Sequence, residues 1–243
     1  MKTIGLIGGI SWQSSVSYYQ VINRRTNELL GGSHSAKVLM YSVDFDEVAR
    51  MQHEGRWDDF KQLLIDIAKR LEKGGADFFL ICANTPHIVA DAIEQEIGIP
   101  LLHIGDAVGE AIQRTGMKKV GLLGTRFTME EDFLRRRFAE RFGIETVVPE
   151  KEDRDIIHSV IYSELVNGDI RDESKSEYLR IIDGLTANGA EGIVLGCTEI
   201  PLLVKSSDTD AALFDTAKIH AERAVDLALG RADAARKVNE VVA

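Results

Sequence analysis

The fold of this chain is decided by residues 189–199, GAEGIVLGCTE, which repeat residues 75–85, GADFFLICANT, without a gap. In each copy glycine, alanine and an acidic residue lead into an apolar run that ends in small polar residues. The constant offset places Cys197 opposite Ala83. An internal repeat of this kind indicates two copies of one structural unit.

A second pair of matching segments supports the duplication. Residues 1–9, MKTIGLIGG, match residues 117–125, MKKVGLLGT, and one short loop change accounts for the small difference in offset. Two matching blocks in the same order indicate two lobes of similar fold. The chain length of 243 residues suits lobes of roughly 110 to 120 residues each.

Short apolar runs bounded by glycine alternate with longer amphipathic stretches, which is the pattern of βαβ units. Strands are expected at residues 3–8, 37–42, 78–82, 101–104, 119–124, 145–148, 192–195 and 213–214. Helices are expected at residues 14–29, 57–73, 85–97, 106–115, 129–142, 155–167, 174–188 and 216–229. The expected strands are hydrophobic almost throughout, as parallel strands covered on both faces are.

These patterns predict an α/β fold with two pseudo-symmetric lobes, each holding a parallel sheet of about four strands flanked by helices. We assign residues 1–98 and 210–243 to an N-terminal lobe and residues 99–209 to a C-terminal lobe. Ligands of open parallel sheets bind beyond the carboxyl ends of the strands. Both repeat blocks carry their polar residues there, so the site is expected in a cleft between the lobes.

Composition and charge narrow the kinds of partner. A hydrophobic content of 44% with 28% charged residues is ordinary for a soluble globular protein. A net charge of −10 argues against nucleic acid, but it leaves a small anionic substrate possible because a few local donors can outweigh the global field. No apolar stretch is long enough for a membrane span. The two cysteines lie in apolar runs, which favours a reducing, cytoplasmic location.

Cys197 is the strongest candidate for chemistry. It follows an apolar strand and precedes a turn, where free backbone N–H groups are expected to lower the thiol pKa and stabilise the thiolate. Such a thiolate acts as a base or a nucleophile. The alternative is a buried structural cysteine, but the place of Cys197 in a repeated strand-end block, beside Thr198 and Glu199, favours function.

The opposing block ends in Asn84 and Thr85, followed by Pro86 at the expected start of a helix. Side-chain and backbone donors at a helix N-terminus suit a carboxylate, although plain helix capping would use the same residues. His87 either orients a neighbour or packs in the helix. Cys82 should point away from the Ala83 side of the strand and pack in the core, because successive side chains on a strand alternate in direction.

Further ligand contacts are expected beyond the other strands, from backbone N–H groups and polar side chains: Gly9, Ile10, Ser11, Gln52, Thr125 and Thr128. Helix capping is the alternative for the two threonines, and a solvated loop for Gln52. The glycines fit neither the dinucleotide spacing nor a phosphate loop, which disfavours nucleotides. The cysteines and histidines lack metal-ligand spacing, so no metal is expected.

Taken together, four motifs resemble the aspartate/glutamate racemase family, nearly end to end: Gly8-Gly9, Asn84-Thr85-x-His87, Leu123-Gly124-Thr125 and Gly196-Cys197-Thr198-Glu199. The resemblance implies two similar α/β lobes, a reaction at their interface without a cofactor, and often a homodimer. It also implies two acid/base residues that face the substrate α-carbon from opposite sides. One removes the proton while the other returns it, which inverts the centre.

The resemblance assigns Cys197 as a catalytic thiol and Asn84, Thr85 and Thr198 as carboxylate-binding groups, with Glu199 also at the substrate. Relatives that act on glutamate often carry histidine at the position of Glu199, so this motif leaves aspartate and glutamate both open. Ala83 stands where family members usually have cysteine and sometimes threonine. An alanine methyl group can neither donate nor accept a proton.

Ala83 leaves three outcomes open. A positioned acid or base contributes about 10² to 10⁴ in rate, so racemisation of a small acidic amino acid continues slowly if water or another residue serves that face. The chain could instead be a one-thiol decarboxylase or isomerase that protonates one face of an enediolate from Cys197. It could also bind a ligand without turnover. We favour the racemase, acting on aspartate or glutamate.

Overall fold

The computed structural model describes residues 1–231, which divide into two compact units. The first unit comprises residues 1–82, 89–103 and the described chain from residue 220 onward. The second unit comprises residues 83–88 and 104–219. These boundaries differ from the lobe boundaries expected at residues 98 and 210. In particular, the short segment 83–88, which holds the end of the first repeat block, groups with the second unit.

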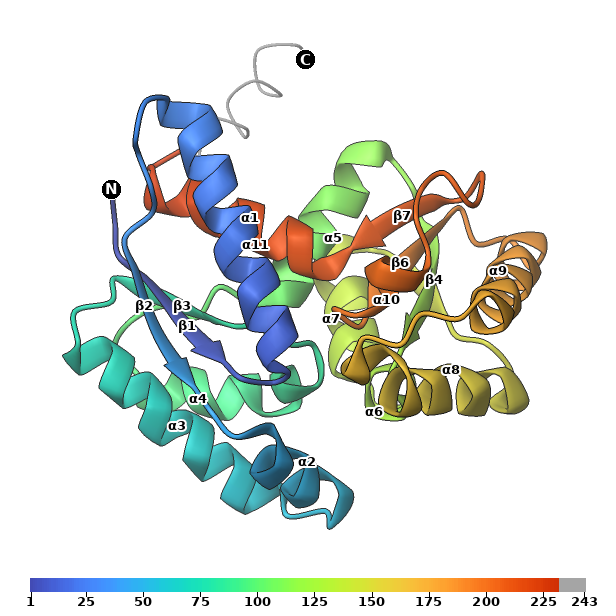
Figure 1. Ribbon diagram of the computed structural model, residues 1–243, viewed down its shortest axis with the longest axis horizontal. Coiled ribbons are helices and arrows are strands. Elements are labelled where there is room, and N and C mark those ends of the chain that lie inside the picture. The colour runs from blue at the N-terminus through green and yellow to red at the C-terminus, as the bar shows by residue number, and fades with distance from the viewer. Residues whose placement is uncertain (232–243) are drawn as a thin grey trace. The chain divides into compact units, whose positions relative to one another are not determined.

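The first unit contains a parallel sheet in the order β2 (Val38–Ser42), β1 (Ile4–Gly8) and β3 (Phe78–Ile81), shown in Figure 1. A fourth strand, expected at residues 101–104, is reduced to one bridge between Phe79 and Leu101. The reason is length: Ile104 already begins the next helix, so the extended run is too short to continue the ladder.

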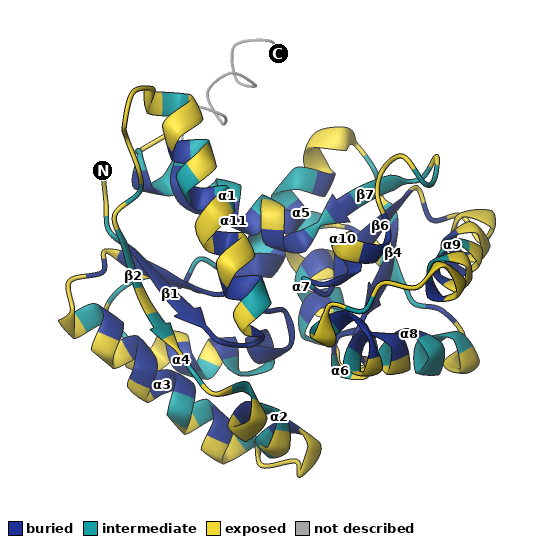
Figure 2. Ribbon diagram, viewed as in Figure 1, coloured by how far each residue is buried: buried dark blue, intermediate teal, exposed yellow. Residues whose placement is uncertain are grey.

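The helices of the first unit are α1 (Trp12–Leu30), α2 (Phe45–His53), α3 (Trp57–Lys73), α4 (Ala90–Glu96) and α11 (Thr216–Ala228) from residue 220 onward. In α3 the buried residues Phe60, Leu64 and Leu71 recur at helical spacing, and Figure 2 shows its opposite face exposed. The helix α2 is absent from the sequence-based expectations. Within residues 1–231, no helix has the length and apolar character needed to cross a membrane.

The second unit contains a parallel sheet of four strands in the order β5 (Glu145–Val147), β4 (Lys119–Gly124), β6 (Gly192–Gly196) and β7 (Ala212–Asp215). Side chains alternate between two cores along each strand. Ile193 and Leu195 enter a core with α8 and α9, whereas Val194 enters a core with α5 and α7. Cys197 belongs to the first of these cores.

The helical elements of the second unit are α5 (Ile104–Thr115), α6 (Arg126–Glu130), α7 (Phe133–Phe142), α8 (Lys151–Ser163), the 3₁₀ turn η2 (Leu165–Asn167), α9 (Asp172–Ala187) and α10 (Ile200–Leu203). The single helix expected at 129–142 is divided into α6 and α7, because Glu131 is extended, with ψ of 149°. The helix expected at 85–97 likewise starts as a 3₁₀ turn, η1 (Thr85–Val89), before α4.

Candidate active site

The candidate site in the second unit begins at one edge of its sheet. The strands β4, β6 and β7 are neighbours and parallel, so their carboxyl ends meet at this edge. The first residues beyond these ends are Thr125, Cys197 and Thr216. The sheet therefore brings two hydroxyls and a thiol to one edge, where ligands of parallel sheets bind.

Two glycines let the strand ends approach one another. A Cβ atom on Gly124 would lie 2.9 Å from the carbonyl oxygen of Gly196 and 3.0 Å from Cβ of Thr128. A Cβ atom on Gly196 would lie 2.7 Å from the carbonyl oxygen of Leu123. A larger residue at either position would displace Thr128 or separate the strands, and both changes would disturb the candidate site.

Three threonine hydroxyls form a triangle. The Oγ1 atom of Thr85 lies 3.1 Å from that of Thr125 and 3.3 Å from that of Thr128, and the latter two atoms lie 3.3 Å apart. The Thr125 oxygen also accepts a hydrogen bond from the Thr128 backbone N–H and so caps α6. All three residues are buried. Since a hydroxyl proton can rotate about the C–O bond, each of the three hydroxyls can redirect its hydrogen bond from a neighbouring threonine to a bound anion.

Asn84 is held beside the triangle by Thr216. The Thr216 hydroxyl donates to the carbonyl oxygen of Leu195 (2.9 Å) and therefore accepts from Nδ2 of Asn84 (3.0 Å). This orientation leaves Oδ1 of Asn84 buried, with no hydrogen-bond partner among residues 1–231. A buried polar atom without a partner is costly, so Oδ1 indicates an acceptor that a ligand can satisfy.

His87 is a structural residue of this turn. Its Nδ1 donates to the carbonyl oxygens of Ala83 (3.0 Å) and Asn84 (3.2 Å), and its Nε2 accepts from the backbone N–H of Ile104 (3.3 Å). The side chain is buried. Because both ring nitrogens are engaged with the backbone, His87 orients the turn.

Cys197 lies in a small acidic network. Its thiol donates a hydrogen bond to Oε2 of Glu199 (3.1 Å), which also accepts from the Thr198 hydroxyl (2.6 Å). The residue is only 8% exposed. Burial and the Glu199 charge raise the pKa of the Cys197 thiol well above its ordinary value. The expected lowering of this pKa is wrong: backbone donors from Glu199 and Ile200 are present, but burial and the neighbouring carboxylate outweigh them.

The surroundings of this network are equally unfavourable to further negative charge. Tyr162 is half-buried, and burial together with Cys197 and Glu199 raises its pKa to about 12. Both Cys197 and Tyr162 are therefore protonated near neutral pH, and the carboxylate of Glu199 is the hydrogen-bond acceptor of the group.

Ala83 and Cys82, which precede Asn84 in the first repeat block, are both buried. Ala83 is buried and presents only its methyl group, and its carbonyl oxygen is held by His87. Cys82 is fully buried, as expected for a packing residue, and burial raises the pKa of its thiol.

The remaining sequence-predicted contacts lie in the first unit. The Gly9 N–H already donates to the Ser15 hydroxyl (2.7 Å), and Ser11 caps α1. Ile10 is buried between them. Gln52 lies on helix α2 rather than in a solvated loop, and its buried Nε2 has no hydrogen-bond partner among residues 1–231.

Sequence reasoning missed the role of Thr216. A signal was available, since Thr216 lies two residues beyond the strand expected at 213–214 and opens an expected helix, much as Asn84 and Thr85 follow the strand expected at 78–82. The anchors of α6 on α8 were also missed, because their residues are separated by about thirty positions and no local pattern connects them.

The chain thus holds two α/β units, each with a parallel sheet, and a cysteine directly beyond strand β6. The family model for Asp/Glu/hydantoin racemases matches residues 7–224. The chain therefore belongs to the Asp/Glu/hydantoin racemase family, whose members support its assignment as an isomerase of the amino-acid racemase type.

Solved structures agree with this assignment. A protein from Yersinia pestis of known crystal structure is 48% identical in sequence to this chain, with a TM-score of 0.89. The match covers 94% of this chain and all of the Yersinia pestis chain. The aspartate racemase homologue from Pyrococcus horikoshii is 37% identical, with a TM-score of 0.83 and the same coverage.

A sequence relative agrees as well. The broad specificity amino-acid racemase RacX of Bacillus subtilis is 22% identical to this chain over 234 residues, which are 91% of this chain and 96% of RacX.

Proposed function

We propose that this protein is a cofactor-independent racemase of a small acidic amino acid, aspartate or glutamate, and that Cys197 is its acid/base residue. The observation that carries the proposal is the pairing of the Cys197 thiol with the Glu199 carboxylate at the edge where the threonine hydroxyls gather. A neutral thiol returns a proton to a carbanion, and a neighbouring carboxylate lets the same thiol become a base.

The proton balance of this pair is favourable. The thiol and carboxylate together hold one proton and one negative charge, whichever atom carries the proton. Transfer from Sγ to Oε2 across 3.1 Å creates a thiolate without adding net charge to a buried site. The thiolate removes the Cα proton, which leaves a planar carbanion with its charge delocalised into the α-carboxylate.

The hydroxyls of Thr85, Thr125 and Thr128 are proposed to bind a substrate carboxylate equally in the bound substrate and in the carbanion. Their hydrogen bonds then determine substrate affinity rather than the rate of the chemical step. Oδ1 of Asn84 is proposed to accept a hydrogen bond from the substrate ammonium group. The absence of a partner for this buried atom among residues 1–231 supports that role. The Thr198 hydroxyl, which now donates to Glu199, is a further carboxylate donor.

Ala83 limits the proposed reaction. Inversion needs a proton from the face opposite Cys197, and the methyl group of Ala83 cannot supply one. Proton exchange through Cys197 alone returns the proton to the same face and retains configuration. We therefore propose that Cα exchange with solvent is faster than racemisation, with water supplying the second face.

We also propose a homodimer, formed through helix α1. Trp12, Val16 and Tyr19 are exposed at helical spacing, with Trp12 at 63%. Residues 12–23 of this helix carry no charge, although the chain has a net charge of −10. Two copies of an acidic chain associate most readily through an uncharged face with exposed aromatic residues. Sedimentation of the protein and of a Trp12→Glu variant tests this: the dimer should be lost in the variant.

Chiral chromatography of reactions with each enantiomer of aspartate and glutamate tests the proposed function. Both enantiomers should appear from at least one of these substrates, slowly, and Cys197→Ser should abolish their formation. Release of carbon dioxide would favour the one-thiol decarboxylase instead. Tight binding of an acidic amino acid without any turnover would favour a ligand-binding protein.

A further inference from the structure

The short helix α6 carries part of the proposed carboxylate site and cannot hold its own position. It contains five residues, Arg126–Glu130; Thr125 directly precedes it as the N-cap, and Thr128 lies within it. An isolated helix of this length is unstable in water. The direction of these two hydroxyls therefore depends on what anchors α6.

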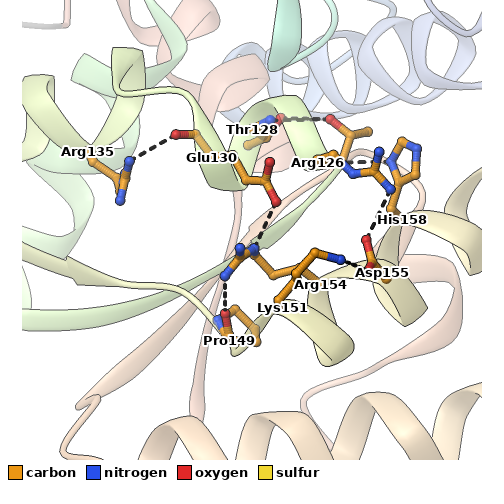
Figure 3. Close-up of polar contacts among 10 residues, drawn as sticks. Arg126, Thr128, Glu130, Arg135, Pro149, Lys151, Arg154, Asp155 and His158 are labelled. Carbon is orange, nitrogen blue, oxygen red and sulfur yellow. Dashed lines mark hydrogen bonds and ion pairs between the residues drawn. The ribbon is translucent and has the colours of Figure 1, made fainter.

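Helix α8 anchors α6 at both ends, as Figure 3 shows. At the first turn, the backbone N–H of Arg126 donates to Nδ1 of His158 (3.2 Å), and the Arg126 guanidinium donates to Asp155 (3.0 Å). At the last turn, the Arg154 side chain donates to Glu130 (3.0 Å). These contacts join residues that are separated by 24 to 32 positions in the chain.

The contact of His158 differs in kind from the two ion pairs. The ion pairs are partly exposed, and such pairs contribute little to stability. The N–H groups of a helix's first turn, in contrast, have no partner within the helix. The Thr125 hydroxyl oxygen accepts a hydrogen bond from the backbone N–H of Thr128, and Nδ1 of His158 accepts one from the backbone N–H of Arg126. The two side chains thus cap α6 together, one from within the strand-end segment and one from α8.

We propose that His158 is a positioning residue, which sets the hydroxyls of Thr125 and Thr128 for the substrate carboxylate by capping α6. The inference rests on the proposed function, because it assigns those hydroxyls to substrate binding. The hydrogen bond requires a lone pair on Nδ1, so the ring proton lies on Nε2. The ring also packs against Tyr162, with 4.8 Å between centroids, which fixes its direction.

Three variants separate this role from general stability. His158→Asn keeps an acceptor near the position of Nδ1, whereas His158→Leu keeps bulk but removes the acceptor. Arg180→Ala is the matched control, because Arg180 on α9 pairs with Asp153 on α8, and none of its hydrogen bonds or ion pairs within residues 1–231 involves α6. Each variant is assayed with both enantiomers of aspartate and glutamate, and amide hydrogen exchange is followed by NMR.

In His158→Leu, exchange at the Arg126 and Thr128 amides should rise about tenfold and KM should rise by a similar factor, with kcat nearly unchanged, as expected for the loss of one hydrogen bond. His158→Asn should restore both values, and Arg180→Ala should leave both unchanged. An unchanged KM in His158→Leu, or equal effects in the Asn and Leu variants, overturns the inference. A Thr85→Val variant that also leaves KM unchanged identifies the proposed function as the part that fails.

Discussion

The Sγ atom of Cys197 lies 3.1 Å from Oε2 of Glu199 and donates a hydrogen bond to it. The same oxygen accepts from the Thr198 hydroxyl, so Glu199 is a shared acceptor at the end of β6. In the proposed reaction this oxygen receives the thiol proton when Cys197 becomes a base.

Replacing Glu199 with glutamine tests this role. The amide cannot take the proton, so turnover should fall by about 10²-fold or more, the usual contribution of a positioned base. Substrate KM should change little, since the side chain keeps its size. Glu164→Gln is the control in steady-state kinetics. Both carboxylates are buried and accept a hydrogen bond from a hydroxyl group, but Glu199 is the one that accepts from the Cys197 thiol. Equal activity in Glu199→Gln and the unchanged protein would contradict the assignment.

Restoring an acid/base group opposite Cys197 should speed inversion. Ala83→Cys supplies the missing thiol, and the racemisation rate should rise by about 10²-fold relative to Cα exchange. Ala90→Cys is the control, because it adds the same sulfur at another buried alanine. Thermal unfolding of both variants reports the cost of adding a larger side chain to the core. A well-folded Ala83→Cys protein with unchanged racemisation would show that residue 83 does not face the substrate.

The threonine triangle predicts a loss of affinity when one hydroxyl is removed. Thr85→Val keeps the shape of the side chain but deletes a donor, so KM should rise about tenfold, the effect of one lost hydrogen bond to a charged group. Thr26→Val is the matched control: its buried hydroxyl donates to the carbonyl oxygen of Ile22 within α1. A similar change of KM in both variants would assign the effect to stability rather than to substrate binding.

His220 makes stability depend on pH in the acid range. It is fully buried between the Tyr18 hydroxyl and the carbonyl oxygen of Leu102, each 2.8 Å away, and burial lowers its pKa to about 4. In the unfolded chain its pKa is near the ordinary value of about 6.5. Between these values the unfolded state binds a proton that the folded state does not, so stability falls as the pH decreases.

The free energy of unfolding should therefore drop by up to about 1.4 kcal/mol per pH unit through this window because of His220 alone. Urea unfolding at pH 7 and pH 4.5 measures the drop, and His220→Gln should reduce it. His53→Gln, at an exposed position of α2, is the comparison variant. The same dependence in His220→Gln as in the unchanged protein would contradict this account.

Most strands could be predicted because parallel strands buried on both faces form short apolar runs, and glycines mark their ends. The run at residues 101–104 has the same composition but forms only one bridge, since Ile104 starts α5. The helix α2 was missed because it is short, although Asp44 followed by Glu47 is a capping signal at its start. Such signals become clear only when the neighbouring elements are known.

The candidate site was predictable where it follows the repeat. Cys197, Asn84 and Thr85 each lie at the end of a repeated block, so their positions follow from topology. The sequence-based prediction that the pKa of Cys197 is lowered was wrong. The shift depends on burial and on the orientation of Glu199, which sequence spacing does not determine. Thr216 and His158 make hydrogen bonds to residues distant in the sequence, which only the folded chain brings together.

The most direct test of the central claim is deuterium incorporation at Cα, followed by NMR for each enantiomer of aspartate and glutamate in heavy water. We expect the protein to exchange the α-proton of at least one substrate, mostly with retention of configuration. Cys197→Ser should abolish the exchange, whereas Cys82→Ser, at the only other cysteine of the chain, should preserve it. Absence of exchange in the unchanged protein, or equal exchange in Cys197→Ser, would contradict the claim.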